Sequence, residues 1–150
     1  MRARGYYNWP VQFPRSLVAG NAERGELHVV ERGGAIVATL ALQWSDELSW
    51  GDAGTDDGAG YVHRLAVRRR HSNGGLGYRL LDWAAERVRA RERGALRLDV
   101  VRSNRRLRDY YEAAGFRHFR DVTGEHTHRD GTRRKWETSL YERACPPAEC

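Results

Sequence analysis

The sequence has few cysteines and no long apolar run, and these two features exclude several classes of protein. Its two cysteines, Cys145 and Cys150, lie in the C-terminal stretch CPPAEC, so we expect free thiols in a frayed terminus, with no disulfide framework and no metal site. No apolar segment approaches the roughly 20 residues that a membrane-spanning helix needs. The N-terminus lacks the apolar segment of a signal peptide, so we expect a cytoplasmic protein without a membrane partner.

Lysine is almost absent, since Lys135 is the single lysine among 26 lysine and arginine residues. The formal net charge of +6 favours anionic ligands such as nucleotide phosphates. The arginines are interleaved with acidic residues, and no aromatic and basic platform typical of RNA-binding proteins is visible. A basic nucleic-acid-binding protein is therefore the last of the alternatives, and we expect no nucleic-acid partner.

A chain of 150 residues is long enough for one domain with a buried core. No internal repeat and no linker divides it. We expect a single domain over residues 1–150, with its core at 26–142, an atypical N-terminal segment at 1–25 and a tail at 143–150.

The pattern of apolar residues predicts a sheet of six strands. The Gly33-Gly34 pair between two β-rich runs is a hairpin signal. The strands are expected at residues 27–31, 35–43, 61–67, 95–101, 116–122 and 135–141. Because a strand–helix–strand crossover lies in the middle, we expect an α/β fold with a mixed central sheet flanked by helices.

Helical spacing of apolar residues predicts one helix from about residue 76, for which Gly94 is the stop signal. A second helix follows that Ser103 or Asn104 can cap and Gly115 ends. Residues 14–24 can hold one short helix, whereas residues 45–60 are rich in Gly, Asp and Ser and are predicted to be a loop.

The segment YVHRLAVRRRHSNGGLGYRLLDWA combines a strand, a basic turn, a glycine-rich turn and a helix. Glycines leave backbone N–H groups unobstructed, and the start of a helix adds free N–H groups and the positive end of its dipole. Together they make a cradle for pyrophosphate. The spacing fits neither a Walker loop nor a dinucleotide-binding fingerprint, and a plain glycine-rich turn is the alternative.

Two motifs here resemble those of the GCN5-related N-acetyltransferase (GNAT) superfamily. Residues 72–77, SNGGLG, resemble motif A, written Gln/Arg-x-x-Gly-x-Gly/Ala, although Ser72 departs from its first position. Residues 98–116, LDVVRSNRRLRDYYEAAGF, resemble motif B: a strand, an asparagine, a tyrosine seven residues on, and Gly-Phe. The resemblance covers about residues 26–142, and the two motifs in this order are far more specific than either alone.

The resemblance implies an enzyme with the GNAT fold, an N-acetyltransferase that moves an acetyl or other short acyl group from acetyl-CoA to an amine. The acceptor attacks directly in a ternary complex, without a metal, and is a small-molecule or peptide amine. The alternative is an inactive GNAT-fold module that binds acyl-CoA and regulates a partner. The implied acetyl-CoA-binding residues are Leu65, Ala66, Val67, Arg70, Ser72, Asn73, Gly74, Gly75, Leu76, Gly77 and Asn104.

The resemblance also implies a catalytic role for Tyr111, which would protonate the departing thiolate, a group of comparable basicity. Asn104 would bind the pantetheine or orient the thioester. The alternatives are a helix cap for Asn104 and a core position for Tyr111. His63 has the intrinsic pKa of a base for an ammonium, and a structural strand histidine is the alternative.

Five carboxylates within residues 45–60 favour a cationic amine as acceptor, although a solvated loop is an equal interpretation. Trp44 and Trp50 flank this region as candidate walls of an acceptor pocket, and for Trp44 a core position at a strand end is the alternative. His126 and His128 have a spacing too weak to predict a metal.

The family usually begins with a strand and two helices, whereas only 25 residues precede Glu26 here. The pairs Trp9-Pro10 and Phe13-Pro14 break regular structure. We therefore expect the N-terminal strand and helix to be reduced or missing. Because loss of an edge strand exposes hydrogen-bonding backbone, we expect a homodimer or the N-terminal segment to cover that edge.

Overall fold

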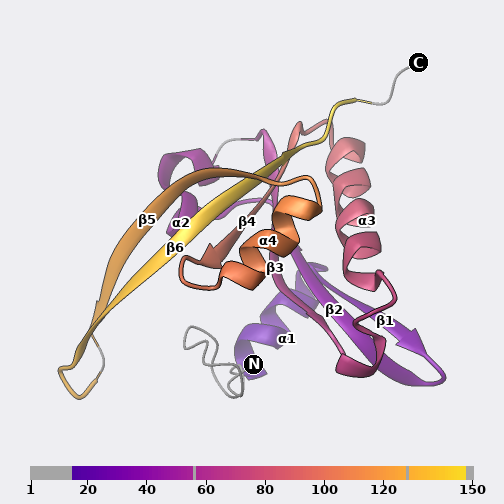
Figure 1. The fold of residues 1–150 in the computed structure, drawn as a ribbon, viewed down its shortest axis with the longest axis horizontal. Helices are drawn as coiled ribbons and strands as arrows, with labels where there is room; N and C mark the ends of the chain where they lie inside the picture. The colour runs from indigo at the N-terminus through magenta and orange to yellow at the C-terminus, as the bar shows by residue number, and fades with distance from the viewer. Residues whose placement is uncertain (1–14, 56, 128, 148–150) are drawn as a thin grey trace.

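The computed structural model describes residues 15–147 apart from residues 56 and 128. The sheet has six strands in the order β1-β2-β3-β4-β6-β5 (Figure 1). They are β1 (Leu27–Arg32), β2 (Ala35–Gln43), β3 (Ala59–Val67), β4 (Ala95–Val101), β5 (Arg117–Thr127) and β6 (Arg133–Ala144). Strands β3 and β4 are parallel and the other neighbours are antiparallel, so the predicted α/β fold with a mixed sheet is confirmed.

The helical elements are α1 (Arg15–Glu23), α2 (Glu47–Trp50), η2 (Gly51–Thr55), η3 (Arg69–His71), α3 (Leu76–Ala90) and α4 (Arg105–Ala113). The short helix expected before the hairpin is present as α1. Asn104 caps α4, because its Oδ1 accepts a hydrogen bond from the Leu107 N–H at 3.1 Å. Helix α3 ends at Ala90, ahead of the predicted stop at Gly94, and Glu92 takes a positive φ of 58° after it.

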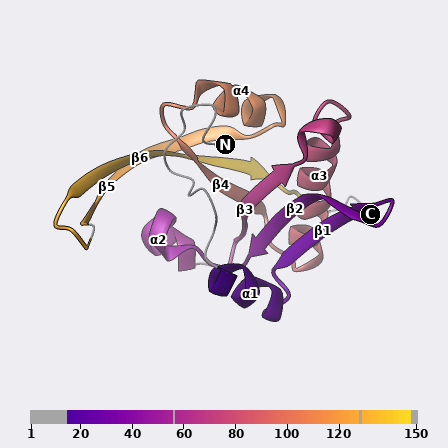
Figure 2. The same ribbon diagram turned by 90° about the horizontal axis from the view of Figure 1, so that it is seen from below.

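The helices cover both faces of the sheet. Helix α3 packs on the face that carries Val62, Leu96 and Leu98, and all belong to the main hydrophobic core. On the opposite face Trp50 of α2 and Tyr61 of β3 form a second, smaller core. Helices α1 and α2 lie on the other side of the sheet from α4 (Figure 2).

The prediction of a loop over residues 45–60 was wrong for residues 47–55, which form α2 and η2, and for residues 59 and 60, which begin β3. Asp46 caps α2 by accepting a hydrogen bond from the Ser49 N–H at 3.1 Å. Trp50 is fully buried and contacts the ring of Tyr61, so it is a core residue and not the wall of an open pocket. The composition was misleading because each helical element here is only about one turn long.

The last two strands are longer than predicted and form a hairpin that extends well beyond the rest of the sheet (Figure 1). The ladder continues to the pair Thr127–Arg133. The polar sequence of this region hid the strands. Gly124 faces Trp136, whose ring occupies the space that a side chain at residue 124 would need.

Cys145 corrects a second prediction, because it is fully buried in the main core instead of lying in a frayed terminus. Its thiol is free, and burial raises the pKa of Cys145. Cys150 and residues 1–14, with the predicted edge cover, lie outside the described residues. Within the described part of the chain, no helix is both long and apolar enough to cross a membrane.

Candidate active site

Strands β3 and β4 pair only over the first three residues of each. Three parallel pairs join them, the last between Tyr61 and Arg97. Strand β3 nevertheless continues to Val67 and β4 to Val101. In the described structure the edge of residues 62–67 that faces β4 therefore has no strand partner, and its backbone groups are available to an extended ligand. The predicted acetyl-CoA contacts Leu65, Ala66 and Val67 lie on this edge.

A β-bulge bends β3 at the same place. One residue of β2, Leu40, lies opposite Arg64 and Leu65 of β3. Arg64 has a φ of +52°, a left-handed conformation that costs a non-glycine residue about 1 kcal/mol or more. The carbonyl of Arg64 accepts a hydrogen bond from the Thr39 hydroxyl at 3.1 Å, and its guanidinium donates to the side chain of Asn21 on α1. These contacts hold the bulge beside the unpaired edge.

Helix α1 is attached to the sheet by Glu26, which follows it. The Glu26 carboxylate accepts hydrogen bonds from Asn21 at 2.6 Å, Arg24 at 3.1 Å and Gln43 at 3.2 Å. Burial by itself raises the pKa of Glu26, but these hydrogen bonds together lower it below its usual range. Since Asn21 also contacts Arg64, the network joins α1 to the bulge of β3.

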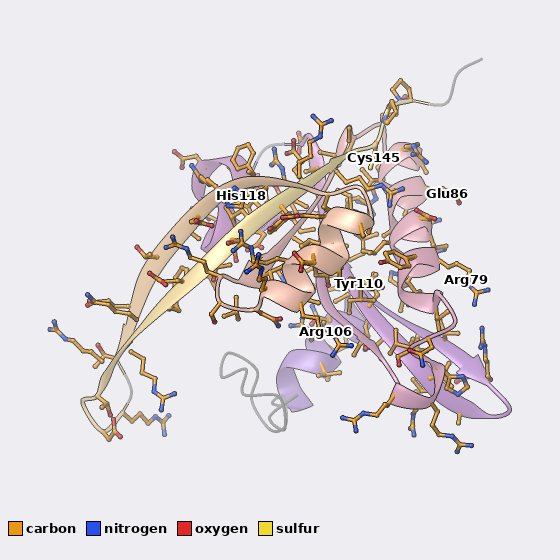
Figure 3. All side chains as sticks on the ribbon, viewed as in Figure 1. Arg79, Glu86, Arg106, Tyr110, His118 and Cys145 are labelled. Carbon is orange, nitrogen blue, oxygen red and sulfur yellow. The ribbon has the colours of Figure 1, made fainter. Side chains whose placement is uncertain are left out.

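The glycine-rich turn leads from β3 into α3, as predicted. Gly75 caps α3 with a φ of 73°, a conformation that favours glycine. No backbone acceptor in the described structure engages the N–H groups of Gly75, Leu76, Gly77 and Tyr78. A side chain at Gly77 would overlap the hydroxyl of Tyr110. Tyr110 lies between α4 and α3 (Figure 3). Its ring stacks on that of Tyr78, with the ring centroids 4.6 Å apart.

The residues of the basic turn between β3 and α3 differ in their contacts. The Ser72 hydroxyl donates to the carbonyl of Arg69 at 2.8 Å, so it stabilises the turn itself. Arg68 donates to the carbonyl of Ile36 at 2.6 Å. Arg69 and Arg70 are exposed and form no ion pair with any described residue. Their positive charges remain available near the free N–H groups of α3.

Helix α4 contributes the two residues of the second motif, and both are buried. Asn104 uses its side-chain oxygen as the helix cap, which leaves its amide N–H groups for another partner. Tyr111 packs edge-on against Phe116 and belongs to the main core. Burial, and to a smaller extent Tyr110 and Asp99, raise the pKa of Tyr111 far above its usual value.

On the other face of the sheet, His63 of β3 lies between two carboxylates. Its Nε2 is 3.1 Å from Oδ2 of Asp46, and its Nδ1 is 3.7 Å from Oδ1 of Asp99 on β4. Burial and the negative charge of Asp46 raise the pKa of Asp99, and His63 opposes that rise. Asp99 was not among the predicted site residues. No local sequence signal marks Asp99. It lies two residues past the last parallel pair, Tyr61–Arg97, as His63 does, so the two residues meet only once the strands are aligned.

Arg97 fixes the segment that carries Asp46. Its guanidinium contacts Glu142 at 2.7 Å, the carbonyl of Ala53 at 2.9 Å and the hydroxyl of Tyr61 at 3.0 Å. It also lies 4.7 Å from the ring centroid of Trp50. Burial lowers the pKa of Arg97, but the contacts with Glu142 and Tyr61 raise it overall.

The structure thus places the predicted residues in two groups, one on each face of the sheet, around the place where β3 and β4 separate. The glycine-rich turn, Asn104 and Tyr111 lie with α3 and α4 on one face of the sheet. His63 lies on the other face with Asp46 and Asp99. Of the five acidic residues in 45–60, Asp46 alone contacts His63 among those described, and Glu47, Asp52 and Asp57 are exposed.

Comparison with known proteins shows similarity over most of the chain. A family model described as the acetyltransferase (GNAT) family matches residues 2–116. A Bacillus subtilis protein named uncharacterized N-acetyltransferase YesJ is 33% identical over 115 residues, which cover 73% of this chain. The chain spans 63% of the length of that relative.

Solved structures share the fold. A GNAT family acetyltransferase from Listeria monocytogenes is 22% identical, with a TM-score of 0.72 over 95% of this chain and 80% of that one. A GNAT family acetyltransferase from Elizabethkingia anophelis, solved with acetyl-CoA bound, is 15% identical, with a TM-score of 0.65 over 93% of this chain and 94% of that one.

Proposed function

Because the chain belongs to the acetyltransferase (GNAT) family, we propose that it is an enzyme that transfers an acetyl group from acetyl-CoA to the amino group of an acceptor. The observation that carries the proposal is the unpaired edge of β3 past Tyr61, with a helix N-terminus at its far end. An extended donor fits along such an edge as an added strand. Residues 26–142 then act as a single acyltransferase domain.

In this proposal the donor lies with its pantetheine arm along Leu65, Ala66 and Val67. Its pyrophosphate takes the free N–H groups at the start of α3, within the turn formed by Ser72, Asn73, Gly74, Gly75, Leu76 and Gly77. Arg70, which has no ion-pair partner among the described residues, supplies positive charge there. The amide of Asn104 donates to the pantetheine or to the thioester carbonyl.

The acceptor reaches the thioester from the opposite face of the sheet, where His63 lies. His63 removes a proton from the ammonium group, and the free amine attacks the carbonyl carbon of the thioester. The new C–N bond forms, the C–S bond breaks, and the thiolate of CoA takes a proton from Tyr111. The Tyr111 phenol is protonated at neutral pH, as an unperturbed tyrosine is, and burial raises its pKa further.

Calorimetric titration with acetyl-CoA, followed by measurement of free CoA thiol in the presence of a panel of amines, tests the proposal. We expect binding and amine-dependent release of CoA. The double variant Arg69→Ala/Arg70→Ala should bind at least about tenfold more weakly. The matched control Arg133→Ala/Arg134→Ala, on the distant hairpin, should bind as the wild type does. Binding without release on any amine would instead support an acyl-CoA-binding module.

The outer edge of β1 has no strand partner among the described residues. Val29 and Ile36 on the β1–β2 hairpin are 45% and 44% exposed. We propose that a second copy of the chain covers this edge in a homodimer and that the enzyme is cytoplasmic. Gel filtration at increasing protein concentration should show the dimer, and a monomer at every concentration contradicts it.

A further inference from the structure

The two carboxylates beside His63 differ in their access to solvent. The side chain of Asp46 is 8% exposed and that of Asp99 is 28% exposed. Asp46 approaches Nε2 of the ring from the α2 side, and Asp99 faces Nδ1 from β4. The Asp46 side of the ring is therefore closed, whereas the Asp99 side is open toward the gap between β3 and β4.

The cluster of Asp46, His63 and Asp99 carries an excess of negative charge. With a neutral imidazole it holds two negative charges, and with a protonated one it still holds a net negative charge. Asp46 Oδ2 is buried and accepts no hydrogen bond from any described residue, since its 3.1 Å contact with His63 lacks hydrogen-bond geometry. No arginine or lysine of the described chain forms an ion pair with either carboxylate. A buried carboxylate oxygen without a hydrogen-bond donor, as in Asp46, favours a cation bound in the cluster.

We propose that this cluster binds the protonated amine of the acceptor, with Asp99 as the carboxylate that receives the ammonium group. This rests on the proposed function and adds a substrate class to it: acceptors that are cationic when they bind. Asp46 is a positioning residue, which holds the closed side of the His63 ring. The ammonium donates to Asp99, transfers its proton to Nδ1 of His63, and then attacks the thioester as a neutral amine.

The cluster offers contacts to an ammonium group, and a metal ion is the competing ligand. One ring nitrogen of His63 and one oxygen of each carboxylate lie within 4.8 Å of one another, a spacing that a metal ion can also use. The 3.7 Å between Nδ1 of His63 and Oδ1 of Asp99 exceeds a hydrogen bond, so neither atom satisfies the other. One ammonium nitrogen carries three hydrogens and can donate to both.

The test uses two small acceptors of the same shape that differ in charge. Butylamine is protonated at neutral pH, and O-propylhydroxylamine is uncharged. Protein labelled with nitrogen-15 in histidine and saturated with CoA is titrated with each, and the His63 ring signal is identified by its loss in His63→Gln. We expect butylamine to shift this signal and O-propylhydroxylamine to have little effect.

Variants then assign the carboxylate. Asp99→Asn should weaken the butylamine response at least about tenfold and raise the KM for butylamine more than it lowers kcat. Asp99→Glu should restore much of the binding, and Asp46→Asn should lower kcat more than it raises KM. The matched control Asp52→Asn removes an exposed charge from the same acidic segment and should leave binding unchanged.

Several results would overturn the inference. Equal responses to the two probes, or an Asp99→Asn protein that binds butylamine normally, would remove Asp99 from the acceptor site. A stoichiometric response to zinc or manganese chloride that excludes butylamine would make the cluster a metal site. Absence of acetyl-CoA binding in a separate calorimetric titration would count against the proposed function. The butylamine titration tests only whether the cluster of Asp46, His63 and Asp99 binds an ammonium group.

Discussion

Gly54 packs directly against the backbone of Asp46, and a β-carbon at residue 54 would overlap the carbonyl oxygen of Asp46. The Asp46 N–H in turn donates a hydrogen bond to the carbonyl of Gly54 at 2.9 Å. Because both partners are backbone, neither can rotate away as the end of a side chain can. The position of Asp46, and with it the contact to His63, therefore depends on the absence of a side chain at Gly54.

We predict that Gly54→Ala displaces Asp46 while the Asp46 carboxylate itself stays in place in the sequence. The variant should lose about 1–3 kcal/mol of stability through overpacking, measured by urea denaturation. It should also transfer acetyl groups to amines more slowly while binding acetyl-CoA normally. Gly94→Ala is the matched control, because a β-carbon at residue 94 meets no atom within 4 Å. A Gly54→Ala protein with normal stability and rate would show that the segment adapts.

Removal of the Tyr111 hydroxyl should slow the acetyl-transfer step without weakening the binding of acetyl-CoA. We expect Tyr111→Phe to lower kcat about a hundredfold or more, the usual contribution of a general acid. The affinity for acetyl-CoA should stay unchanged, because the ring keeps its edge-on contact with Phe116. Stopped-flow release of CoA and calorimetry measure the two quantities. Tyr78→Phe, which changes a partly exposed tyrosine on α3, is the control.

The pH dependence of the same residue gives a separate check. Burial first, then Tyr110 and Asp99, raise the pKa of Tyr111 above the ordinary tyrosine value of about 10. The phenol therefore stays protonated in the folded enzyme up to and beyond that pH. The kcat of the wild type should not decline near pH 10 through ionisation of Tyr111. The wild type and Tyr111→Phe should therefore have pH profiles of the same form in this range. A decline at lower pH that disappears in this variant would contradict the assignment.

The hydrogen bonds of Glu26 should make stability depend on pH in the acid range. Its folded-state pKa lies below the unfolded value of about 4.3, so its contribution is present above that pH and is lost as the pH falls. We expect Glu26→Gln to unfold about 1–3 kcal/mol more easily at pH 7, because the buried Asn21 amide loses a charged acceptor. Urea denaturation at pH 7 and pH 3.5 should show that the difference from wild type shrinks in acid.

Glu23→Gln provides the matched control, since Glu23 is an exposed residue of α1. It should change stability little at either pH. If the two variants behave alike, the network from Glu26 through Asn21 does not attach α1 to the sheet.

The family and most elements of the fold could be predicted because they depend on local signals. Residues 35–43 and 95–101 were predicted with the bounds that β2 and β4 have, since apolar runs and flanking glycines mark them. The long β5–β6 hairpin could not be predicted at full length. Its outer part is polar, and its ladder is held by cross-strand pairs such as Gly124–Trp136 that leave no periodic pattern.

The site was predictable only in part, for a related reason. The glycine-rich turn and the Asn104 cap follow from residues close together in the sequence. Asp99, by contrast, lies within an apolar strand and reads as an ordinary alternating residue. Its contact with His63 depends on the register of two strands that lie more than 30 residues apart. The roles of Tyr111 and His63 in catalysis remain predictions.

Asn104 has two roles that substitutions can separate. Its side-chain oxygen caps α4, and in the proposed function its amide N–H donates to the bound donor. Asp and Asn cap helices about equally well, so Asn104→Asp should keep the stability of the protein. It removes the donor, however, and adds a negative charge near the thioester. We expect Asn104→Asp to lower the affinity for acetyl-CoA or kcat about tenfold or more.

Asn104→Ala removes the cap as well and should cost about 1 kcal/mol of stability in addition to the same loss of function. Thermal unfolding and calorimetry with acetyl-CoA measure the two effects on the same samples. If Asn104→Asp is as stable and as active as wild type while Asn104→Ala is only less stable, then Asn104 is a helix cap alone. In that case the donor must take its hydrogen bonds here from the backbone of β3.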